Sequence, residues 1–206
     1  MTHMAGEITE VDILREIGSI GAGNATIALS ELIQQKILIT LPGIYVISPE
    51  KVPKLLGFHE MPVVIIYKRL QENDNCDILL VFEKEEANKI VLAVAKNTFG
   101  IEDIDEEMKK SIIKEVGNIV IGAFLSAISN FTDMRLLPEP PIHVKDIFDA
   151  ILEVFLTKLC IQNRKAMVFK TCFKKEEGEI YGAIILFLSD KLQEDLIKRG
   201  REWLEG

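Results

Sequence analysis

The sequence predicts an α+β fold: an antiparallel sheet with helices packed on one face. Apolar residues recur with a helical period over about 9–34 and 105–130, and two pairs of strand-length apolar segments are joined by short polar turns. The two helical segments also match each other, because Glu16 and Pro42 recur 99 residues later as Glu115 and Pro141. This internal duplication predicts two homologous halves, about 8–100 and 105–206, related by pseudo-twofold symmetry within a single domain, 1–206.

The first half begins with a long helix. Thr9-x-x-Asp12 resembles a capping box, and the apolar spacing that follows continues the helix to about residue 34. The other predicted elements are a strand over 36–48 bent at Pro42-Gly43, a short helix over 49–57, a hairpin of strands 61–70 and 77–82 across the polar turn 72–75, and a helix over 84–98.

The second half repeats this order. Asp105, Glu106 and Glu107 place negative charge on the first turn of its long helix, where it complements the positive end of the helix dipole. The remaining elements are an extended segment over 134–144, a helix over 146–159, a hairpin of strands 166–174 and 179–188, and a final helix over 190–204.

Composition excludes several classes of function. A net charge of -8 argues against a nucleic-acid partner, because phosphate binding needs clustered Lys and Arg. The apolar runs are far shorter than the roughly 20 residues that span a bilayer, so we expect a cytoplasmic protein without membrane insertion. Cys76, Cys160 and Cys172 have no metal-binding spacing and are interpreted as inert thiols in a reducing compartment. The three histidines are scattered, and no metal site is expected.

The second long helix carries a polar stripe. Ser111, Glu115, Asn118 and Gly122 fall at roughly 0°, 40°, 340° and 20° around an α-helix, opposite its apolar positions. The duplicate positions in the first helix are Asp12, Glu16, Ser19 and Gly23. Folding alone does not require Glu and Asn in line with a bare Gly on a solvent-facing stripe, and the Gly suggests that another surface comes close. The alternative interpretations of the stripe are a solvated helix face without a function and a self-association surface.

The glycines of Gly18-x-x-Gly21-x-Gly23-Asn24 do not form a phosphate loop. No strand precedes them, and they lie inside the predicted helix rather than before its N-terminus. Close helix packing explains them better. Asn24 aligns with Ala123 on the apolar side, so we expect its amide in the interior. Pro42 and Pro141 are expected to shape the chain behind each helix.

The duplicated pattern D/S-x3-E-x2-N-x22-P resembles the CheC family of bacterial chemotaxis phosphatases, which includes CheX and FliY. Two copies of the pattern favour CheC over the single-motif CheX. The resemblance implies a substrate, the phosphorylated response regulator CheY, whose own Mg²⁺ makes a cofactor in this chain unnecessary. It also suggests CheD, a receptor deamidase, as a partner, with the amphipathic 146–159 segment as a candidate contact. We expect a monomer.

The resemblance assigns roles to residues. Glu115 docks by pairing with a lysine beside the phosphoryl group, and the amide of Asn118 holds the attacking water. Ser111, Gly122 and Asp12 fall at substrate-binding positions. Glu16 keeps the docking role in the first copy, but Ser19 replaces the Asn, and its shorter hydroxyl offers one donor where the amide offers two. We therefore expect the first site to be impaired. The alternative is a low-activity adaptor that sequesters phosphorylated CheY or regulates CheD.

Overall fold

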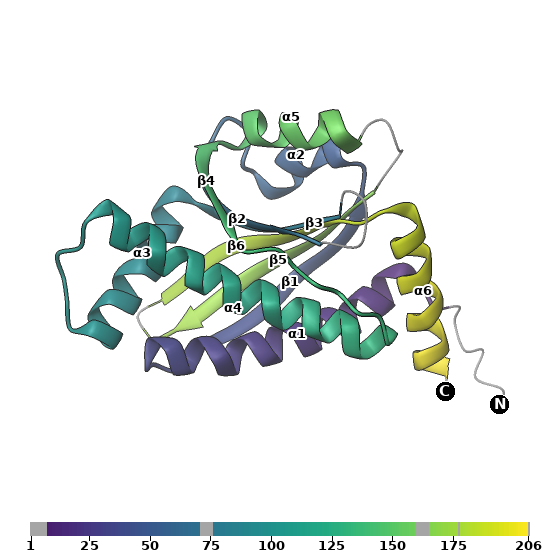
Figure 1. The fold of residues 1–206 in the computed structure, drawn as a ribbon, viewed down its shortest axis with the longest axis horizontal. Coiled ribbons are helices and arrows are strands. Elements are labelled where there is room, and N and C mark those ends of the chain that lie inside the picture. The colour runs from purple at the N-terminus through teal and green to yellow at the C-terminus, as the bar shows by residue number, and fades with distance from the viewer. Residues whose placement is uncertain (1–7, 71–75, 160–164, 177, 206) are drawn as a thin grey trace.

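Six strands form one antiparallel sheet in the computed structural model, which describes residues 8–70, 76–159, 165–176 and 178–205 (Figure 1). Across the sheet the order is β1-β5-β6-β3-β2-β4. The strands are β1 (Leu38–Ile47), β2 (Pro62–Arg69), β3 (Asp77–Glu83), β4 (Ile142–Ile147), β5 (Ala166–Lys175) and β6 (Gly178–Phe187). The α+β class and the antiparallel sheet are confirmed.

The strand order has the symmetry expected from the predicted duplication. Exchanging each strand of the first half for its counterpart in the second (β1 for β4, β2 for β5, β3 for β6) reverses the order and leaves it otherwise unchanged. The pseudo-twofold axis therefore passes between β3 and β6, where Leu80 pairs with Ile184. Both predicted hairpins are present, although the turn predicted over 72–75 lies outside the described residues.

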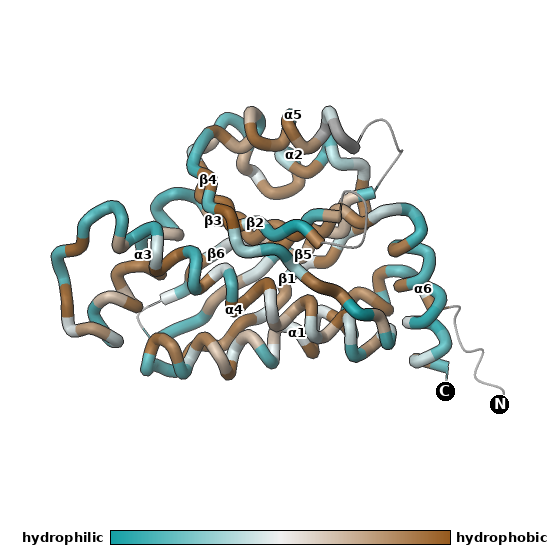
Figure 2. Tube along the Cα trace, in the orientation of Figure 1, coloured by the Kyte–Doolittle hydropathy of each residue, from teal (hydrophilic) through white to brown (hydrophobic). Residues whose placement is uncertain are grey.

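The long helices lie side by side on one face of the sheet (Figure 1). These are α1 (Glu10–Ile33) and α4 (Glu106–Thr132), flanked by α3 (Lys84–Val94) with its π-helical continuation (Ala95–Phe99) and by α6 (Asp190–Glu205). Alternate strand residues point toward them and build the larger core: Val64, Ile66, Leu80, Phe82, Met167, Phe169, Phe173 and Ile184. The hydropathy colouring shows the apolar sides of α1 and α4 directed toward each other and the sheet (Figure 2).

The opposite face is covered too, which corrects the expectation that all helices pack on one face. The short 3-10 turn Pro49–Lys51 leads into α2 (Val52–Leu56), and α2 and α5 (Phe148–Leu159) lie on this side (Figure 1). A second core joins them to the other alternate strand residues: Val52, Phe58, Val63, Ile65, Leu79, Val81, Phe148, Leu152, Phe155, Val168 and Ile185. Strands buried on both faces need cover on both faces.

The predicted helix boundaries hold to within a few residues. Thr9 and Asp12 form the expected capping box of α1, and Asp105 caps α4 by accepting a hydrogen bond from Met108 N at 2.8 Å. The helix predicted from Asp146 begins at Phe148 instead, because β4 keeps pairing with β2 up to Ile147. β1 changes register between Thr40 and Gly43, at the predicted bend.

Asn24 is exposed, so the prediction of an interior amide is wrong. The buried residues of α1 recur every four positions, and each step of four turns about 40° beyond a full turn. The buried face therefore rotates away from Asn24 along the helix. The series is Ile13, Ile17, Gly21, Ala25, Leu29 and Ile33.

Candidate functional site

The polar stripe of α4 faces outward, as predicted. Ser111 and Glu115 are exposed, Asn118 and Gly122 are half-buried, and the residues on the opposite side of the helix are in the core. Glu115 and Asn118 are three positions apart and so lie on the same helix surface about one turn from each other. A carboxylate and an amide thus share one surface that another protein can reach.

Two glycines of α4 have different surroundings. A Cβ built on Gly117 would lie 2.4 Å from Ile66 Cγ2, so the absence of a side chain lets the helix rest directly on β2. A Cβ built on Gly122 would have no atom within 4 Å. Packing inside the protein does not require a glycine at position 122. Because Gly122 has no side chain, the helix backbone beside Asn118 is accessible to a partner.

Lys68 on β2 contacts Asn118 from the sheet side of α4 and was not among the predicted site residues. Its Nζ donates a hydrogen bond to Asn118 Oδ1 at 2.5 Å, while its side chain is buried with 7% exposure. Burial lowers the pKa of the Lys68 ammonium, and the negative charge of Glu115 opposes that shift. A sequence signal was available: Val64, Ile66 and Lys68 alternate along β2, so Lys68 continues the side that faces the helices.

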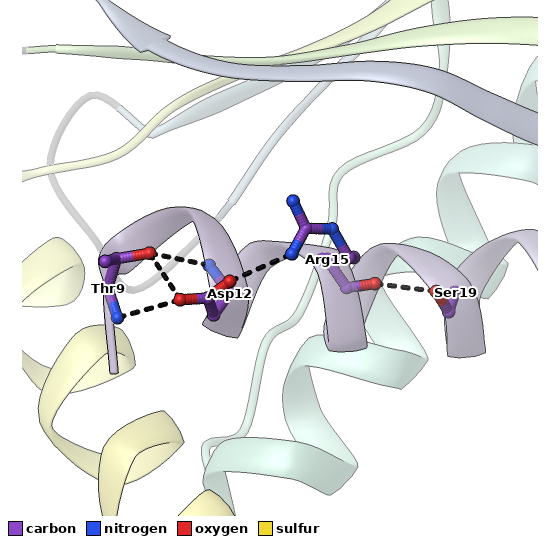
Figure 3. A network of polar contacts seen from close by, with 4 residues as sticks. All are labelled: Thr9, Asp12, Arg15 and Ser19. Atoms are coloured by element: carbon purple, nitrogen blue, oxygen red, sulfur yellow. Dashed lines mark hydrogen bonds and ion pairs between the residues drawn. The ribbon is translucent and has the colours of Figure 1, made fainter. Parts of the chain in front are cut away.

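The first copy of the stripe is organised differently (Figure 3). The Asp12 carboxylate accepts hydrogen bonds from the backbone and hydroxyl of Thr9 and from Arg15, so it serves the start of its own helix. The Ser19 hydroxyl donates to the Arg15 carbonyl at 2.7 Å, within the helix. Glu16 is half-buried. In this copy the polar groups at the Asp12 and Ser19 positions are bonded locally.

A groove of about 610 Å³ runs beside Ser19 between α1 and β1. Its walls include Arg15, Gly23, Pro42 and Gly43, and an added Cβ on Gly23 would again meet no atom within 4 Å. Of the glycines first assigned to close packing, Gly18 and Gly21 do pack, against Phe169 and Phe124, but Gly23 does not. Gly23 therefore shares the open setting of Gly122.

Positive charge gathers beside the N-terminal half of α4. Burial lowers the pKa of His143 on β4, and the nearby ammonium groups of Lys110, Lys145 and Lys114 lower it further. His143, Lys110 and Lys145 line a small groove of about 160 Å³ with the first turns of α4. The same groove also contains Glu106, which pairs with Lys109 and Lys145, so the charge on the turns before Glu115 is mixed, with lysines in excess.

Within the described residues the metal-ligating side chains are dispersed and the cysteine thiols are buried. There, no three His, Cys, Asp or Glu residues are grouped so that they could hold a metal ion. Cys76 and Cys172 are buried free thiols, and burial raises the pKa of Cys172. Cys160 lies outside the described residues. Among the described helices α4 alone is long and apolar enough to cross a membrane, but its apolar side is part of the protein core.

Comparison with known proteins finds matches over the α4 region and over most of the chain. A model of the CheC-like family matches residues 108–144, which include Glu115, Asn118 and Pro141. The chain is 30% identical over 164 residues to the CheY-P phosphatase CheC of Bacillus subtilis (strain 168), covering 79% of this chain and 78% of that protein. It is 31% identical over 133 residues to the flagellar motor switch phosphatase FliY of the same organism, covering 64% of this chain and 34% of FliY.

A solved structure has the same fold as this chain. FliY from Thermotoga maritima matches with a TM-score of 0.75 at 20% identity, covering 97% of this chain and 100% of that one. The predicted family resemblance is thus confirmed by a relative at 30% identity over most of both chains. The chain belongs to the CheC-like family.

Proposed function

We propose that this protein is a cytoplasmic phosphatase that hydrolyses the aspartyl phosphate of a CheY-type response regulator. The observation that carries the proposal is the exposed stripe of α4, on which Glu115 and Asn118 lie one turn apart beside the open backbone of Gly122. The relative named CheY-P phosphatase supports the choice of substrate.

In the proposed reaction, a water attacks phosphorus in line with the bond to the regulator's aspartate. The new P–O bond forms as the aspartyl P–O bond breaks, which releases inorganic phosphate and a free carboxylate. The Asn118 amide orients the water, because an amide offers both donors and an acceptor, and the barrier falls through positioning. We assign the Mg²⁺ that neutralises phosphoryl charge to the regulator.

Glu115 holds the regulator in place. Its carboxylate is exposed, and we propose that it pairs with the lysine beside the regulator's phosphoryl group. Ser111 and Gly122 line the same contact, and Gly122 lets the two backbones approach. In the first copy Glu16 and Asp12 would contact the regulator more weakly, since Asp12 is bonded to Thr9 and Arg15 and Ser19 to its own helix.

The test is turnover. Phosphorylated regulator is mixed with a tenth of an equivalent of this protein, and the loss of phosphate is followed until it is complete. A phosphatase accelerates the loss of phosphate from every regulator molecule, whereas an adaptor changes the lifetime of at most one molecule per binding site. A stoichiometric effect would overturn the proposal in favour of sequestration.

A deamidase of the CheD type is proposed as a second partner, contacting α5. Val154 on this helix is 59% exposed, and it borders a groove of about 220 Å³ that also includes Tyr67, Ile151 and Phe155. Titration calorimetry with Val154→Glu tests the contact, with Leu92→Glu on α3 as the matched control because Leu92 is also exposed, at 48%. Equal binding by both variants would remove α5 from the proposal.

A further inference from the structure

Lys68 is the only lysine that is buried among the described residues. The other buried polar or charged side chains there are Asp77, Thr132 and Thr171. Asp77 is paired with Arg69, and Thr132 donates to a carbonyl of its own helix. A buried ammonium is expensive to desolvate, and an apolar side chain of similar volume at such a position is often neutral or stabilising. The stability of the fold therefore does not explain why a lysine stands at position 68.

The bond to Asn118 fixes which way the amide points. An ammonium group can only donate hydrogen bonds, so the atom of Asn118 that it contacts must be the side-chain oxygen. The amide NH₂ group then points away from Lys68. Its two donors and the second lone pair of the oxygen remain for a water, and the rotation of the amide is restricted before any substrate binds.

The duplicate site on α1, which lies against β5, shows what the same position looks like without this bond. Gly117 packs on Ile66 of β2, and its duplicate Gly18 packs on Phe169 of β5. Two residues further along each strand, on the same face, stand Lys68 and Thr171. Thr171 is therefore the structural counterpart of Lys68.

Thr171 lacks the function that Lys68 has. Its Oγ1 is the one buried side-chain nitrogen or oxygen among the described residues that has no hydrogen-bond partner. Ser19, at the position equivalent to Asn118, donates to Arg15 of its own helix. The ammonium and the amide thus occur together at the α4 site, built from α4 and β2, and both are absent from the α1 site, built from α1 and β5.

We propose that Lys68 is a positioning residue for Asn118, so that the working site is the unit Lys68, Asn118 and Glu115 rather than the helix pair alone. This inference rests on the proposed phosphatase function. Lys68 itself contacts no substrate. It sets the orientation of the amide, and the amide orients the water.

The first test replaces Lys68 by Met, which keeps an unbranched apolar side chain and removes the donor. Misplacing a positioning group can lower a rate by about 100-fold, so kcat for the phosphorylated regulator should fall about 10- to 100-fold while KM stays within about twofold. Lys68→Arg, which keeps a cationic donor, should recover part of the rate. The matched control is Lys170→Met on β5, because Lys170 lies over the ring of Tyr45 and away from α4.

The second test needs no substrate. The side-chain NH₂ resonances of Asn118, assigned through Asn118→Ala, are followed by NMR in the unliganded protein. Lys68→Met should shift them and increase their mobility, and Lys170→Met should leave them unchanged. Unchanged Asn118 resonances in a folded Lys68→Met protein overturn the proposal, and so does an unchanged kcat. If the wild-type protein shows no turnover, the phosphatase function fails, and the NMR result alone then decides whether Lys68 positions Asn118.

Discussion

The ammonium of Lys68 lies 2.5 Å from the side-chain oxygen of Asn118, although 50 residues separate the two in sequence. One belongs to a strand and the other to the helix packed above it. This contact joins the most buried cation of the described chain to the predicted water-orienting amide, and the duplicate site on α1 has no equivalent contact.

Replacing Glu115 by Gln should weaken docking and spare the chemistry. Gln keeps the size of the side chain and removes the charge, and a hydrogen bond to a charged group contributes about 1.5–3 kcal/mol. KM for the phosphorylated regulator should therefore rise roughly tenfold or more with kcat within twofold. Steady-state kinetics measures both. Glu16→Gln is the matched control, and an equal rise in KM for both variants would mean that the two copies dock the regulator alike.

Substitutions at Gly122 should separate stability from docking. Because no atom lies within 4 Å of an added Cβ, Gly122→Ala should raise the free energy of unfolding by up to about 1 kcal/mol. Gly122→Leu should fold equally well, yet its side chain would occupy the surface beside Asn118, so KM should rise at least tenfold. Urea denaturation and kinetics measure the two effects.

The control for this pair is Gly23→Leu, at the equally open position of the first copy. It should leave turnover unchanged. Wild-type KM in Gly122→Leu would contradict a docking surface on this part of α4.

The first site should need two changes to become active. In an Asn118→Ala background, Ser19→Asn supplies an amide, but Thr171 cannot orient it, so turnover should recover little. Adding Thr171→Lys should recover more than the sum of the two single changes, since residues in contact are coupled by about 0.5–3 kcal/mol. Circular dichroism must show that the triple variant is folded. Full recovery with Ser19→Asn alone would show that the amide needs no lysine.

Stability should depend on His143 at acidic pH. Burial and the charges of Lys110, Lys145 and Lys114 hold its pKa below the ordinary 6.5. Between these two values the unfolded chain binds more protons than the folded one, so stability falls as pH drops from 6.5 through the lowered pKa. Urea unfolding at pH 7.5 and pH 5 should show a smaller acid loss for His143→Gln than for the wild type.

His59 provides a control of opposite sign. Its hydrogen bond to Asp149 raises the pKa of His59 above 6.5, so its contribution is present at low pH and disappears as pH rises through the raised value. His59→Gln should therefore not reduce the acid loss of stability. The same response from both variants would contradict the assigned causes.

Much of this fold was predictable because its signals are local. Each of these signals lies within a short stretch of sequence. They are the capping box at Thr9, the four-residue spacing of apolar side chains in α1 and the polar turn between β5 and β6. The exposed stripe of α4 followed from the helical period together with the repeat at Glu16 and Glu115. The helical period and the repeat can both be read from the helix sequences themselves, without knowledge of what each helix packs against.

The rest depended on contacts between distant elements. Lys68 stands in a strand next to Tyr67 and Arg69, and only the packing of α4 on β2 reveals that it points at Asn118. The cover of the second face by α5 depends on where β4 joins the sheet edge. Asn24 was predicted to be interior because it aligns with Ala123, but Ala123 is itself only half-buried, and the buried face of α1 has rotated away from position 24.

A single rate decides whether the Asn118 amide orients the attacking water. The decay of phosphorylated regulator is measured with catalytic amounts of the wild-type protein, Asn118→Ala and Ser19→Ala. Asn118→Ala should lose about 100-fold or more of the assisted rate, as expected when a transition-state contact is removed, and Ser19→Ala should keep it. Wild-type turnover by a folded Asn118→Ala protein would contradict the account.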